Sequence, residues 1–242
     1  MIDLRGKRAF VTGGGRGIGR ATALLLARAG ATVAVGYRAR KPAAESHITA
    51  VVRGDLGAPT GAEKAVAEAL RALGGGLDIL VVNHGVWPPD NVPVAEMTDD
   101  QWESTRRANL DAVIFVCRAA IPSIPEGGTI VLVSSTAGQR GEAFHADYAA
   151  TKGAVIAITK SLAVELAPKI TVNCVAPGWV DTEMSAKPYA REGRRKIEQT
   201  IPLRRVASAE DVAGPIVFLC SSLARHITGE ILNVNGGSVL CG

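Results

Sequence analysis

The segment SSTAGQRGEAFHADYAATK contains two side chains suited to proton transfer, Tyr148 and Lys152, four residues apart. On a helix this spacing places both on one face, one turn from each other. A phenol ionises near pH ~10, and a neighbouring ammonium group favours the ionised form, so we expect Lys152 to lower the pKa of Tyr148. With the Ser135 hydroxyl to hold a reacting oxygen, these residues could form a general acid/base site. Taken alone, a Tyr and a Lys at this spacing are more often an ordinary surface pair.

A second stretch, TGGGRGIGR at residues 12–20, places five glycines between an apolar, strand-like run and a helix-like run. A glycine-rich turn between a first strand and a first helix lets the backbone approach a pyrophosphate, which the helix N-terminus attracts. The residues do not satisfy G-x-G-x-x-G. They spell T-G-x-x-x-G-x-G, using Thr12, Gly13, Gly17 and Gly19. A tight turn is the alternative, but the strand before and the helix after favour a nucleotide site.

Strand-like and helix-like segments alternate along almost the whole chain. Several of the strand-like segments are continuously apolar, as strands buried on both faces are. Alternation through short links predicts one α/β domain, with a parallel sheet covered by helices on both faces. We also expect a left-handed cap at Gly30 and a capping box formed by Ser208 and Asp211. The predicted strands are residues 8–12, 31–36, 47–53, 77–83, 128–134, 169–175 and 230–234, and the predicted helices lie near 17–29, 61–73, 100–120, 147–167 and 209–223.

The composition is that of a globular protein: of the 242 residues, 47% are hydrophobic and 21% are charged. No apolar run approaches the ~18 residues of a membrane-spanning helix, and the first residues lack the pattern of a signal peptide. We therefore expect a cytoplasmic protein with no membrane partner. The four cysteines have neither metal-ligand nor redox spacing, so we expect no metal site and no structural disulfide, with Cys117 and Cys220 buried.

The net charge of +4 arises partly from a basic segment between residues 191 and 205. Nucleic acid is a poor candidate partner, because the sequence has no recognised binding motif and only 4% aromatic residues. A solvated segment is the simplest interpretation, and attraction to a phosphorylated ligand or an acidic carrier is the alternative. The residues concerned are Arg191, Arg194, Arg195, Lys196, Arg204 and Arg205.

Together these features resemble the single-domain branch of the short-chain dehydrogenase/reductase family, over the whole chain. The glycine motif of the family is matched from Thr12 to Gly19, its Y-x-x-x-K pair by Tyr148 and Lys152, and its serine by Ser135. The resemblance implies a Rossmann-type, doubly wound parallel sheet of about seven strands, with residues 1–242 forming a single domain. Further matches are Asn109 for the family's helical asparagine, Pro177 and Gly178 for its proline-glycine turn, and TGEILNVNGG for its last strand.

The resemblance also implies roles for these residues. Tyr148 exchanges a proton with the substrate oxygen, Ser135 fixes that oxygen, and Lys152 holds the nicotinamide ribose. Asn109 anchors a water that links the lysine to solvent, and no metal is required. The cofactor residues implied are Thr12, Gly13, Arg16, Gly17, Ile18, Gly19, Arg38, Asp55, Asn83, Gly85, Tyr148, Lys152, Pro177, Gly178 and Thr182.

The sequence departs from the family pattern at several points. The N-N-A-G motif reads Val82-Asn83-His84-Gly85, where Val82 forfeits a polar contact and His84 is either structural or catalytic, the former being favoured. Asn235 stands where an aspartate is common. Only YRARKPAAES separates the second and third predicted strands, so we expect a loop or single turn in place of a helix.

The cofactor is predicted from charge at the end of the second strand. NAD-preferring relatives place an aspartate there to accept from the ribose 2′-hydroxyl. This chain reads Gly36-Tyr37-Arg38, without a carboxylate. Arg38 and Arg16 could neutralise a 2′-phosphate, which favours NADP(H) over NAD(H), although both could be solvated surface arginines.

Residues 183–205 fall where relatives carry a lid over the substrate. Their arginines suit an anionic or carrier-linked carbonyl compound, as in the 3-oxoacyl-(acyl-carrier-protein) reductase-type members, which the chain resembles most. The alternatives are an NAD(H)-dependent dehydrogenase of secondary alcohols or sugars, and a nucleotide sensor without catalysis. Sensors typically lack the Tyr-Lys pair, and enoyl reductases space it more widely.

The helices predicted near 100–120 and 147–167 carry apolar residues on more than one face. One face of each must cover the sheet, and the other would leave an exposed apolar patch unless a partner buries it. Relatives pair these helices across two-fold axes. We therefore expect a homotetramer, with a dimer as the alternative.

Overall fold

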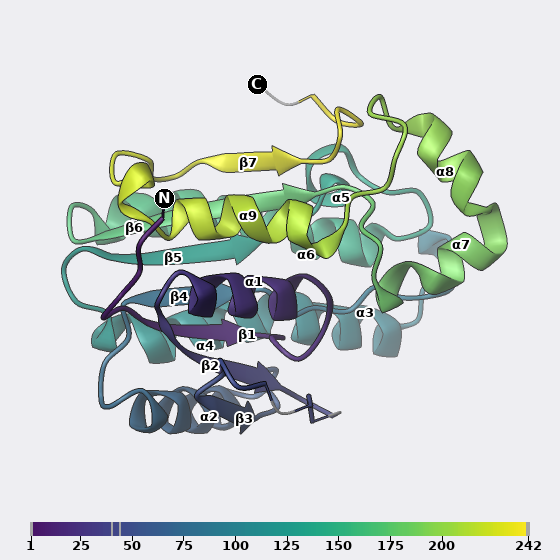
Figure 1. Cartoon of the computed structure of the whole chain (residues 1–242). Coiled ribbons are helices and arrows are strands. Elements are labelled where there is room, and N and C mark those ends of the chain that lie inside the picture. Colours follow the sequence, from purple (N-terminus) through teal and green to yellow (C-terminus); the bar gives the residue numbers. More distant parts are fainter. Residues whose placement is uncertain (1, 40, 44, 241–242) are drawn as a thin grey trace.

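The computed structural model describes residues 2–39, 41–43 and 45–240 and contains one sheet of seven parallel strands (Figure 1). The strands lie in the order β3-β2-β1-β4-β5-β6-β7. The order reverses between β1 and β4, which makes this a doubly wound sheet with its switch point there, as predicted. The strands are β1 Arg8–Thr12, β2 Thr32–Tyr37, β3 Ala50–Arg53, β4 Ile79–Val82, β5 Gly128–Val133, β6 Ile170–Pro177 and β7 Ile231–Val234.

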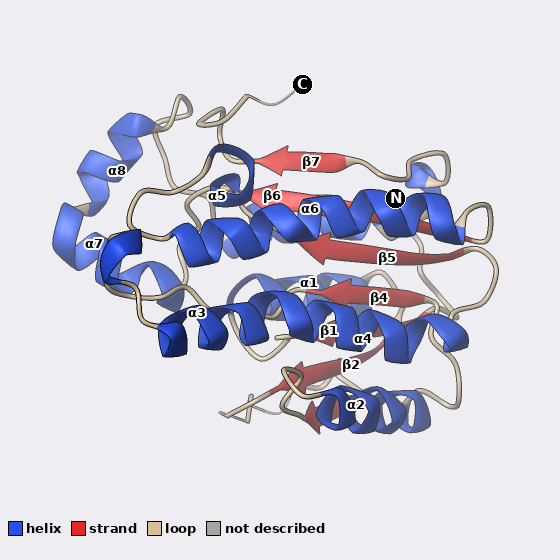
Figure 2. Ribbon diagram, turned by 180° about the vertical axis from the view of Figure 1, so that it is seen from behind, coloured by secondary structure: helices blue, strands red, loops and turns tan. Residues whose placement is uncertain are grey.

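Helices cover both faces of the sheet, and each face has its own apolar core. Helices α1 (Gly17–Arg28) and α9 (Ala209–Leu219) pack on one face, in front of the sheet in Figure 1. Helices α2 (Pro59–Ala72), α4 (Ala112–Ala120) and α6 (Ala146–Leu166) pack on the other, toward the viewer in Figure 2. The central strands β4 and β5 are buried along their whole length, which explains why they are continuously apolar.

The single helix predicted near 100–120 is wrong in its continuity. The segment forms α3 (Asp99–Arg106), a π-helical turn η2 (Arg107–Asp111) and α4. The wider turn contains Asn109, whose side chain bonds the backbone of Val86 twice: Nδ2 donates to the carbonyl oxygen at 2.9 Å, and Oδ1 accepts from the amide at 2.7 Å. π-Turns inside helices frequently occur at functional sites, and this one fixes a buried asparagine against the loop after β4.

Several local predictions are confirmed. Ser208 and Asp211 form the capping box of α9, and Gly30 has a φ of 100°. In the described part of the crossover between β2 and β3 the chain forms turns and bends without a helix. Cys117 and Cys220 are buried, as is the free thiol of Cys174, whereas Cys241 lies outside the described residues.

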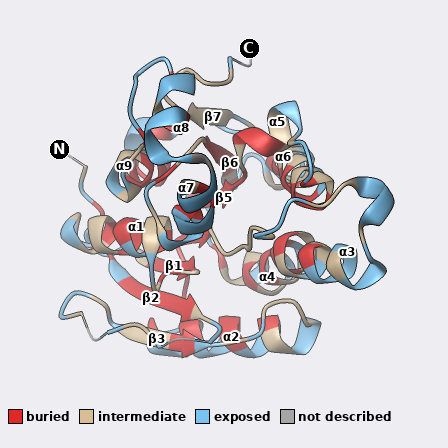
Figure 3. Ribbon diagram, turned by 90° about the vertical axis from the view of Figure 1, so that its right-hand side faces the viewer, coloured by how far each residue is buried: buried red, intermediate tan, exposed pale blue. Residues whose placement is uncertain are grey.

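Three short helices were not predicted: α5 (Thr136–Arg140), α7 (Ala186–Glu192) and α8 (Arg194–Thr200). They are too short to show an amphipathic period, so packing rather than pattern determines them. Helices α7 and α8 lie beyond the carboxyl ends of the strands and are largely exposed when seen from that end (Figure 3). Short 3-10 turns complete the chain: η1 Val94–Glu96, η3 Ile121–Ser123, η4 Glu183–Ser185 and η5 Ser222–Ala224.

None of the helices within the described residues combines the length and the apolar character needed to span a lipid bilayer. The described residues also contain no group of three or more His, Cys, Asp or Glu side chains that could hold a metal ion.

Candidate active site

A cavity of about 1260 Å³ opens at the carboxyl ends of the strands. Its walls come from the glycine turn after β1, the loops after β4, β5 and β6, helix α6, and the segment after Thr182 that the sequence predicts to be a lid. This is where a doubly wound sheet binds its ligand, because the connections after β1 and β4 leave in opposite directions and part there.

The glycine turn forms one wall because its backbone approaches other backbone closely. Gly13 and Gly17 have φ angles of 63° and 50°, in the left-handed region that glycine tolerates best. A Cβ on Gly19 would lie 2.3 Å from the carbonyl oxygen of Gly13 and 2.5 Å from Nδ2 of Asn83. Helix α1 begins at Gly17 without a side-chain cap, so the free N–H groups of its first turn point toward the cavity. This arrangement fits the pyrophosphate of a dinucleotide.

Thr12 ties the glycine turn to the end of β4. Its hydroxyl accepts from the amide of Asn83 at 3.1 Å and lies 2.8 Å from Nδ1 of His84. The Nδ2 group of Asn83 donates to the carbonyl oxygens of Thr12 and Gly13, each at 3.3 Å. His84 is therefore a structural link in this region. Burial lowers its pKa to about 3, with the charges of Lys152 and Arg38 adding to the effect, so the imidazole is neutral.

The three proton-handling residues predicted from the sequence meet at the cavity wall. Ser135 caps α5 by accepting from the amide of Ala137 at 3.2 Å, and it lies close enough to the phenol of Tyr148 to favour its ionised form. Nζ of Lys152 donates to the carbonyl oxygen of Val133 at 2.9 Å and lies 5.8 Å from the centre of the Tyr148 ring. Tyr148 and Lys152 are both buried on one face of α6, as their spacing predicts.

The expected direction of the Tyr148 pKa is wrong for this cavity. Burial raises the pKa of Tyr148 to about 12, and the nearby Ser135 hydroxyl opposes this only in part. Burial also lowers the pKa of Lys152 to about 8. Desolvation disfavours the charged form of each group and is the largest cause of both shifts in pKa. The phenol is therefore protonated at neutral pH.

Buried polar contacts hold these side chains in place, and one of the groups was missed from the sequence. Asp147 is fully buried, accepts from the Thr105 hydroxyl of α3 at 2.8 Å, and caps the amide of Tyr148 at 2.8 Å. The hydroxyl of Ser134 donates to the carbonyl oxygen of Lys152 at 2.7 Å. Asp147 thus ties α3 to the turn of α6 that carries the tyrosine, a role with no signal in the sequence because it depends on tertiary contact.

The end of β2 presents positive charge to the cavity. Apart from Lys152, Arg38 and Lys41 are the cavity-lining cations without a carboxylate partner in the part of the chain that the structure describes. Arg16, by contrast, pairs with Glu183 at 2.7 Å. Lys41 was missed, because it follows the strand by several residues in an irregular loop. Arg38 and Lys41 are therefore the side chains whose positive charge is available to a 2′-phosphate.

Aromatic side chains line the cavity beside Tyr148. The ring of Trp87 lies edge-on to two other rings. Its centre is 4.7 Å from the ring centre of Tyr148 and 4.0 Å from that of His145. The ring centres of Trp179 and of Tyr189 in α7 lie 6.3 Å apart. Both rings pack on a small cluster made by Ile197, Ile201 and Val206. Neither tryptophan was predicted from the sequence to line the site. The lid therefore has an apolar core of its own.

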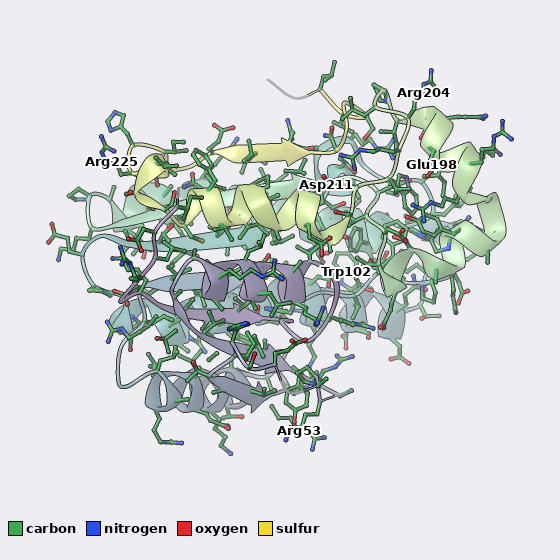
Figure 4. All side chains as sticks on the ribbon, viewed as in Figure 1. Arg53, Trp102, Glu198, Arg204, Asp211 and Arg225 are labelled. Atoms are coloured by element: carbon green, nitrogen blue, oxygen red, sulfur yellow. The ribbon has the colours of Figure 1, made fainter. Side chains whose placement is uncertain are left out.

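The basic segment of the lid is partly neutralised. Arg194 pairs with Asp181 at 2.6 Å and with Glu198 at 3.0 Å, and Arg205 pairs with Asp211. Glu198, Arg204 and Asp211 are labelled in Figure 4, on the lid and on the helix beside it. These ion pairs reduce the positive charge that the lid offers to a ligand.

Most residues predicted to bind a cofactor line the cavity, and three predicted residues support it from behind. Thr12, Gly19 and Asn109 are buried outside the cavity wall. Asp55 lines the cavity and pairs with Arg107 at 3.1 Å. The predicted residues that line it are Gly13, Arg16, Gly17, Ile18, Arg38, Asp55, Asn83, Gly85, Ser135, Tyr148, Lys152, Pro177, Gly178 and Thr182.

Known proteins resemble this chain over nearly its whole length. A family profile described as "Enoyl-(Acyl carrier protein) reductase" matches residues 13–238. The 3-oxoacyl-(acyl-carrier-protein) reductase of Aquifex aeolicus (strain VF5) is 39% identical over 248 residues, covering 98% of each chain. A short-chain dehydrogenase/reductase of Brucella melitensis, also described as a glucose/ribitol dehydrogenase, has 34% identity and a TM-score of 0.90 over 99% of each chain. A short-chain dehydrogenase of Burkholderia cenocepacia, solved in complex with NADP, has 34% identity and a TM-score of 0.86, covering 97% of this chain and 98% of its own.

Proposed function

The chain belongs to the short-chain dehydrogenase/reductase family, whose members are NAD(P)-dependent oxidoreductases, and we propose that it interconverts a carbonyl compound and a secondary alcohol with NADP(H). The observation that carries the proposal is that Ser135, Tyr148 and Lys152 line one cavity together with the glycine turn, with Tyr148 and Lys152 buried one helical turn apart. A sensor or scaffold has no need of this set.

In the reduction direction, Oη of Tyr148 donates its proton to the carbonyl oxygen, and the Ser135 hydroxyl hydrogen-bonds that oxygen and fixes its position. In oxidation the same phenolic oxygen takes the proton from the alcohol. The raised pKa of Tyr148 keeps the phenol protonated at neutral pH, which is the form that reduction requires. The nicotinamide ring supplies or accepts the hydride when the cofactor is bound. Lys152 holds the ribose hydroxyls. Its Nζ atom and the side chain of the active-site asparagine, Asn109, both lie beside Gly85.

NADP(H) is the cofactor that the free charge favours. Arg38 and Lys41 present positive charge where β2 ends, and the strand ends without a carboxylate for a ribose 2′-hydroxyl. The Burkholderia relative binds NADP, which supports the same choice. The aspartate common in the final strand is Asn235 here, and it closes a local turn by donating to the carbonyl oxygen of Val239 at 2.9 Å.

A 3-oxoacyl thioester, free or linked to a carrier, is a proposed substrate because the Aquifex relative is named for that reaction. The competing proposal is an NAD(H)-dependent dehydrogenase of a secondary alcohol or sugar, supported by the name of the Brucella relative. The proposed location is the cytoplasm, as the sequence predicts.

The proposed assembly is a homotetramer, with a dimer as the alternative. Helix α6 exposes 82% of Val164, and α4 exposes Ile114, so each carries apolar surface on the side away from the sheet. A self-complementary patch of this kind closes as a symmetric oligomer. Light scattering at micromolar concentration tests this, and a fully active particle of 25.1 kDa would contradict it.

NADPH or NADH oxidation by the purified protein tests the function. The panel contains 3-oxoacyl thioesters, diketones, simple ketones, sugars and an enoyl thioester. We expect oxidation of NADPH with at least one carbonyl compound and none with the enoyl thioester. Tight NADPH binding without turnover on any carbonyl would support a sensor instead.

A further inference from the structure

The two tryptophans that line the cavity indicate what kind of carbonyl compound it takes. We infer that the substrate carries an aromatic ring next to the reacting carbonyl and that this ring lies between Trp87 and Trp179. The inference rests on the proposed function and concerns the same site. It names a substrate class: aryl ketones and aryl-substituted 3-oxoacyl compounds, in preference to polyols and straight-chain acyl groups.

Trp87 holds the position nearest the proton donor. Its indole lies edge-on to the Tyr148 ring at 4.7 Å, and to His145 on its other side at 4.0 Å. The indole N–H is buried without a hydrogen-bond partner in the described part of the chain. The ring is thus fixed by aromatic packing rather than by a polar contact. A group bound at the Tyr148 hydroxyl must pass this indole.

Trp179 comes from the opposite side, directly after the proline-glycine turn that ends β6. The tilted contact with Tyr189 at 6.3 Å and the apolar cluster of the lid support its ring from behind. Trp179 also lines the cavity, as do Met184 and Pro188 from the lid. Two supported indoles from segments about ninety residues apart in the sequence therefore line one cavity.

Several charged side chains of the cavity lining are paired. Arg140 pairs with Glu142 at 2.9 Å, and Glu183 pairs with Arg16 at 2.7 Å. The remaining lining includes apolar residues, such as Val86 and Ala137, and also hydroxyl groups, such as those of Ser135 and Ser185. In the described part of the chain, the lining cations without a carboxylate partner other than Lys152 are Arg38 and Lys41, near the end of β2. An anionic or polyhydroxylated group would gain no aromatic contact from the tryptophans, and the hydration that it loses on burial is costly unless hydrogen bonds replace it.

An aromatic ring fits these walls better than an alkyl chain does. Aromatic pairs favour offset or edge-on arrangements with ring centres about 4.5–7 Å apart, and they gain stability beyond the burial of area. Supported indoles lose little conformational entropy when they bind a flat group, whereas a flexible chain must lose its own. Each indole should therefore favour an aryl group over a saturated group of the same size by roughly threefold to tenfold.

The test uses two ketones that differ only in ring saturation, acetophenone and methyl cyclohexyl ketone, with NADPH as the reductant. The ratio of their kcat/KM values is measured for the wild type, Trp87→Leu, Trp179→Leu and the control Trp102→Leu. Trp102 lies on α3, is 41% exposed and does not line the cavity. Dividing each variant's ratio by that of the wild type cancels the intrinsic reactivity of the ketones.

We expect the aryl preference to fall about threefold to tenfold in Trp87→Leu and in Trp179→Leu, and to stay unchanged in Trp102→Leu. Trp87→Phe and Trp179→Phe keep an aromatic wall and should retain the preference, which provides a test even if a leucine variant misfolds. An unchanged ratio in active tryptophan variants would overturn the aryl site while leaving the reductase intact. Failure of every carbonyl with the wild type would instead defeat the proposed function.

Discussion

The glycine turn at residues 13–19 and the lid at residues 183–205 meet at the same cavity but are held in place differently. The turn is fixed by backbone packed against backbone, next to the fully buried strand β4. The lid rests on a cluster of three buried side chains and on exposed ion pairs of Arg194. Among the described residues, the ion pair of Arg16 with Glu183 joins the two regions, and Thr182, just before the lid, packs close to Gly17.

This difference has a physical consequence. A site built from buried backbone tolerates almost no added atom, because the interior is close-packed. A lid held by exposed ion pairs, each worth about 0–1 kcal/mol, can move at little cost. We therefore interpret the turn as the fixed wall for the cofactor and the lid as the adaptable wall for the substrate. Tyr148, the proposed proton donor, lines the cavity that these two walls enclose.

The largest expected effect comes from Tyr148, which lines the cavity that the two regions share. Tyr148→Phe removes the transferable proton and little else, so kcat should fall by roughly 10²–10⁴-fold. The affinity for NADPH, measured by fluorescence titration, should stay the same, because the glycine turn is unchanged. A variant that keeps more than about a tenth of the wild-type kcat would show that another group is the acid.

A charge reversal on the cofactor side is expected to have the next largest effect. Arg38→Asp should weaken NADPH binding by roughly 2–5 kcal/mol and leave NADH binding unchanged or improved. The matched control is Arg71→Asp, which changes an exposed arginine on α2 that does not line the cavity. Isothermal titration with both cofactors measures the difference. Equal losses for NADPH and NADH would mean that Arg38 supports the fold rather than a phosphate.

The pH dependence of stability tests the burial of Lys152. Burial lowers the pKa of Lys152 from 10.5 to about 8. Burying the charged lysine therefore reduces the free energy of unfolding by its full amount below pH 8. This reduction disappears as the pH rises from 8 to 10.5. Lys152→Met removes this charge. The free energy of unfolding of the variant should therefore exceed that of the wild type by about 3 kcal/mol at pH 7, and this difference should shrink between pH 8 and 10.5. Urea unfolding at several pH values decides it, and a gain independent of pH would contradict a buried charge.

One glycine-to-alanine substitution in the glycine turn and one in the lid compare how far each wall tolerates an added methyl group. Gly19→Ala places a Cβ 2.3 Å from a backbone oxygen, and Gly193→Ala meets no atom within 4 Å but has a φ of 83°. Each should cost roughly 1–3 kcal/mol of stability, by overpacking and by backbone strain respectively. The alanine at position 19 should also weaken NADPH binding about tenfold or more, because the turn must shift. Equal cofactor affinity in the two variants would remove the distinction between the walls.

The same contrast explains how much the sequence could predict. Gly13, Gly17 and Gly19 are required by backbone angles and close approaches, so their spacing identified the turn. The alternation of strands with helices and the shared face of Tyr148 and Lys152 also follow from local periodicity, whereas the doubly wound sheet was implied by the family resemblance. The helices of the lid and the tryptophan walls could not be predicted in this way, because they depend on which side chains meet across the fold.

Two further points were beyond the sequence for the same reason. The pKa of Tyr148 rises rather than falls, since desolvation depends on depth of burial and not on which residue lies four positions away. The role of Asp147 arises from Thr105, which only the packing of α3 against α6 brings near. Arg16 likewise shows the limit of charge counting, because its partner, Glu183, lies far away in the sequence.

Transfer of a labelled hydrogen tests the central claim most directly. The wild type is mixed with NADPH carrying deuterium at both hydrogen positions of nicotinamide C4 and with the best ketone of the panel, and the alcohol is analysed by mass spectrometry. We expect deuterium on the carbinol carbon at one atom per NADPH oxidised, and no labelled alcohol from Tyr148→Phe under the same conditions. NADPH oxidation without deuterium in the alcohol, or labelled alcohol formed equally fast by Tyr148→Phe, would contradict the account.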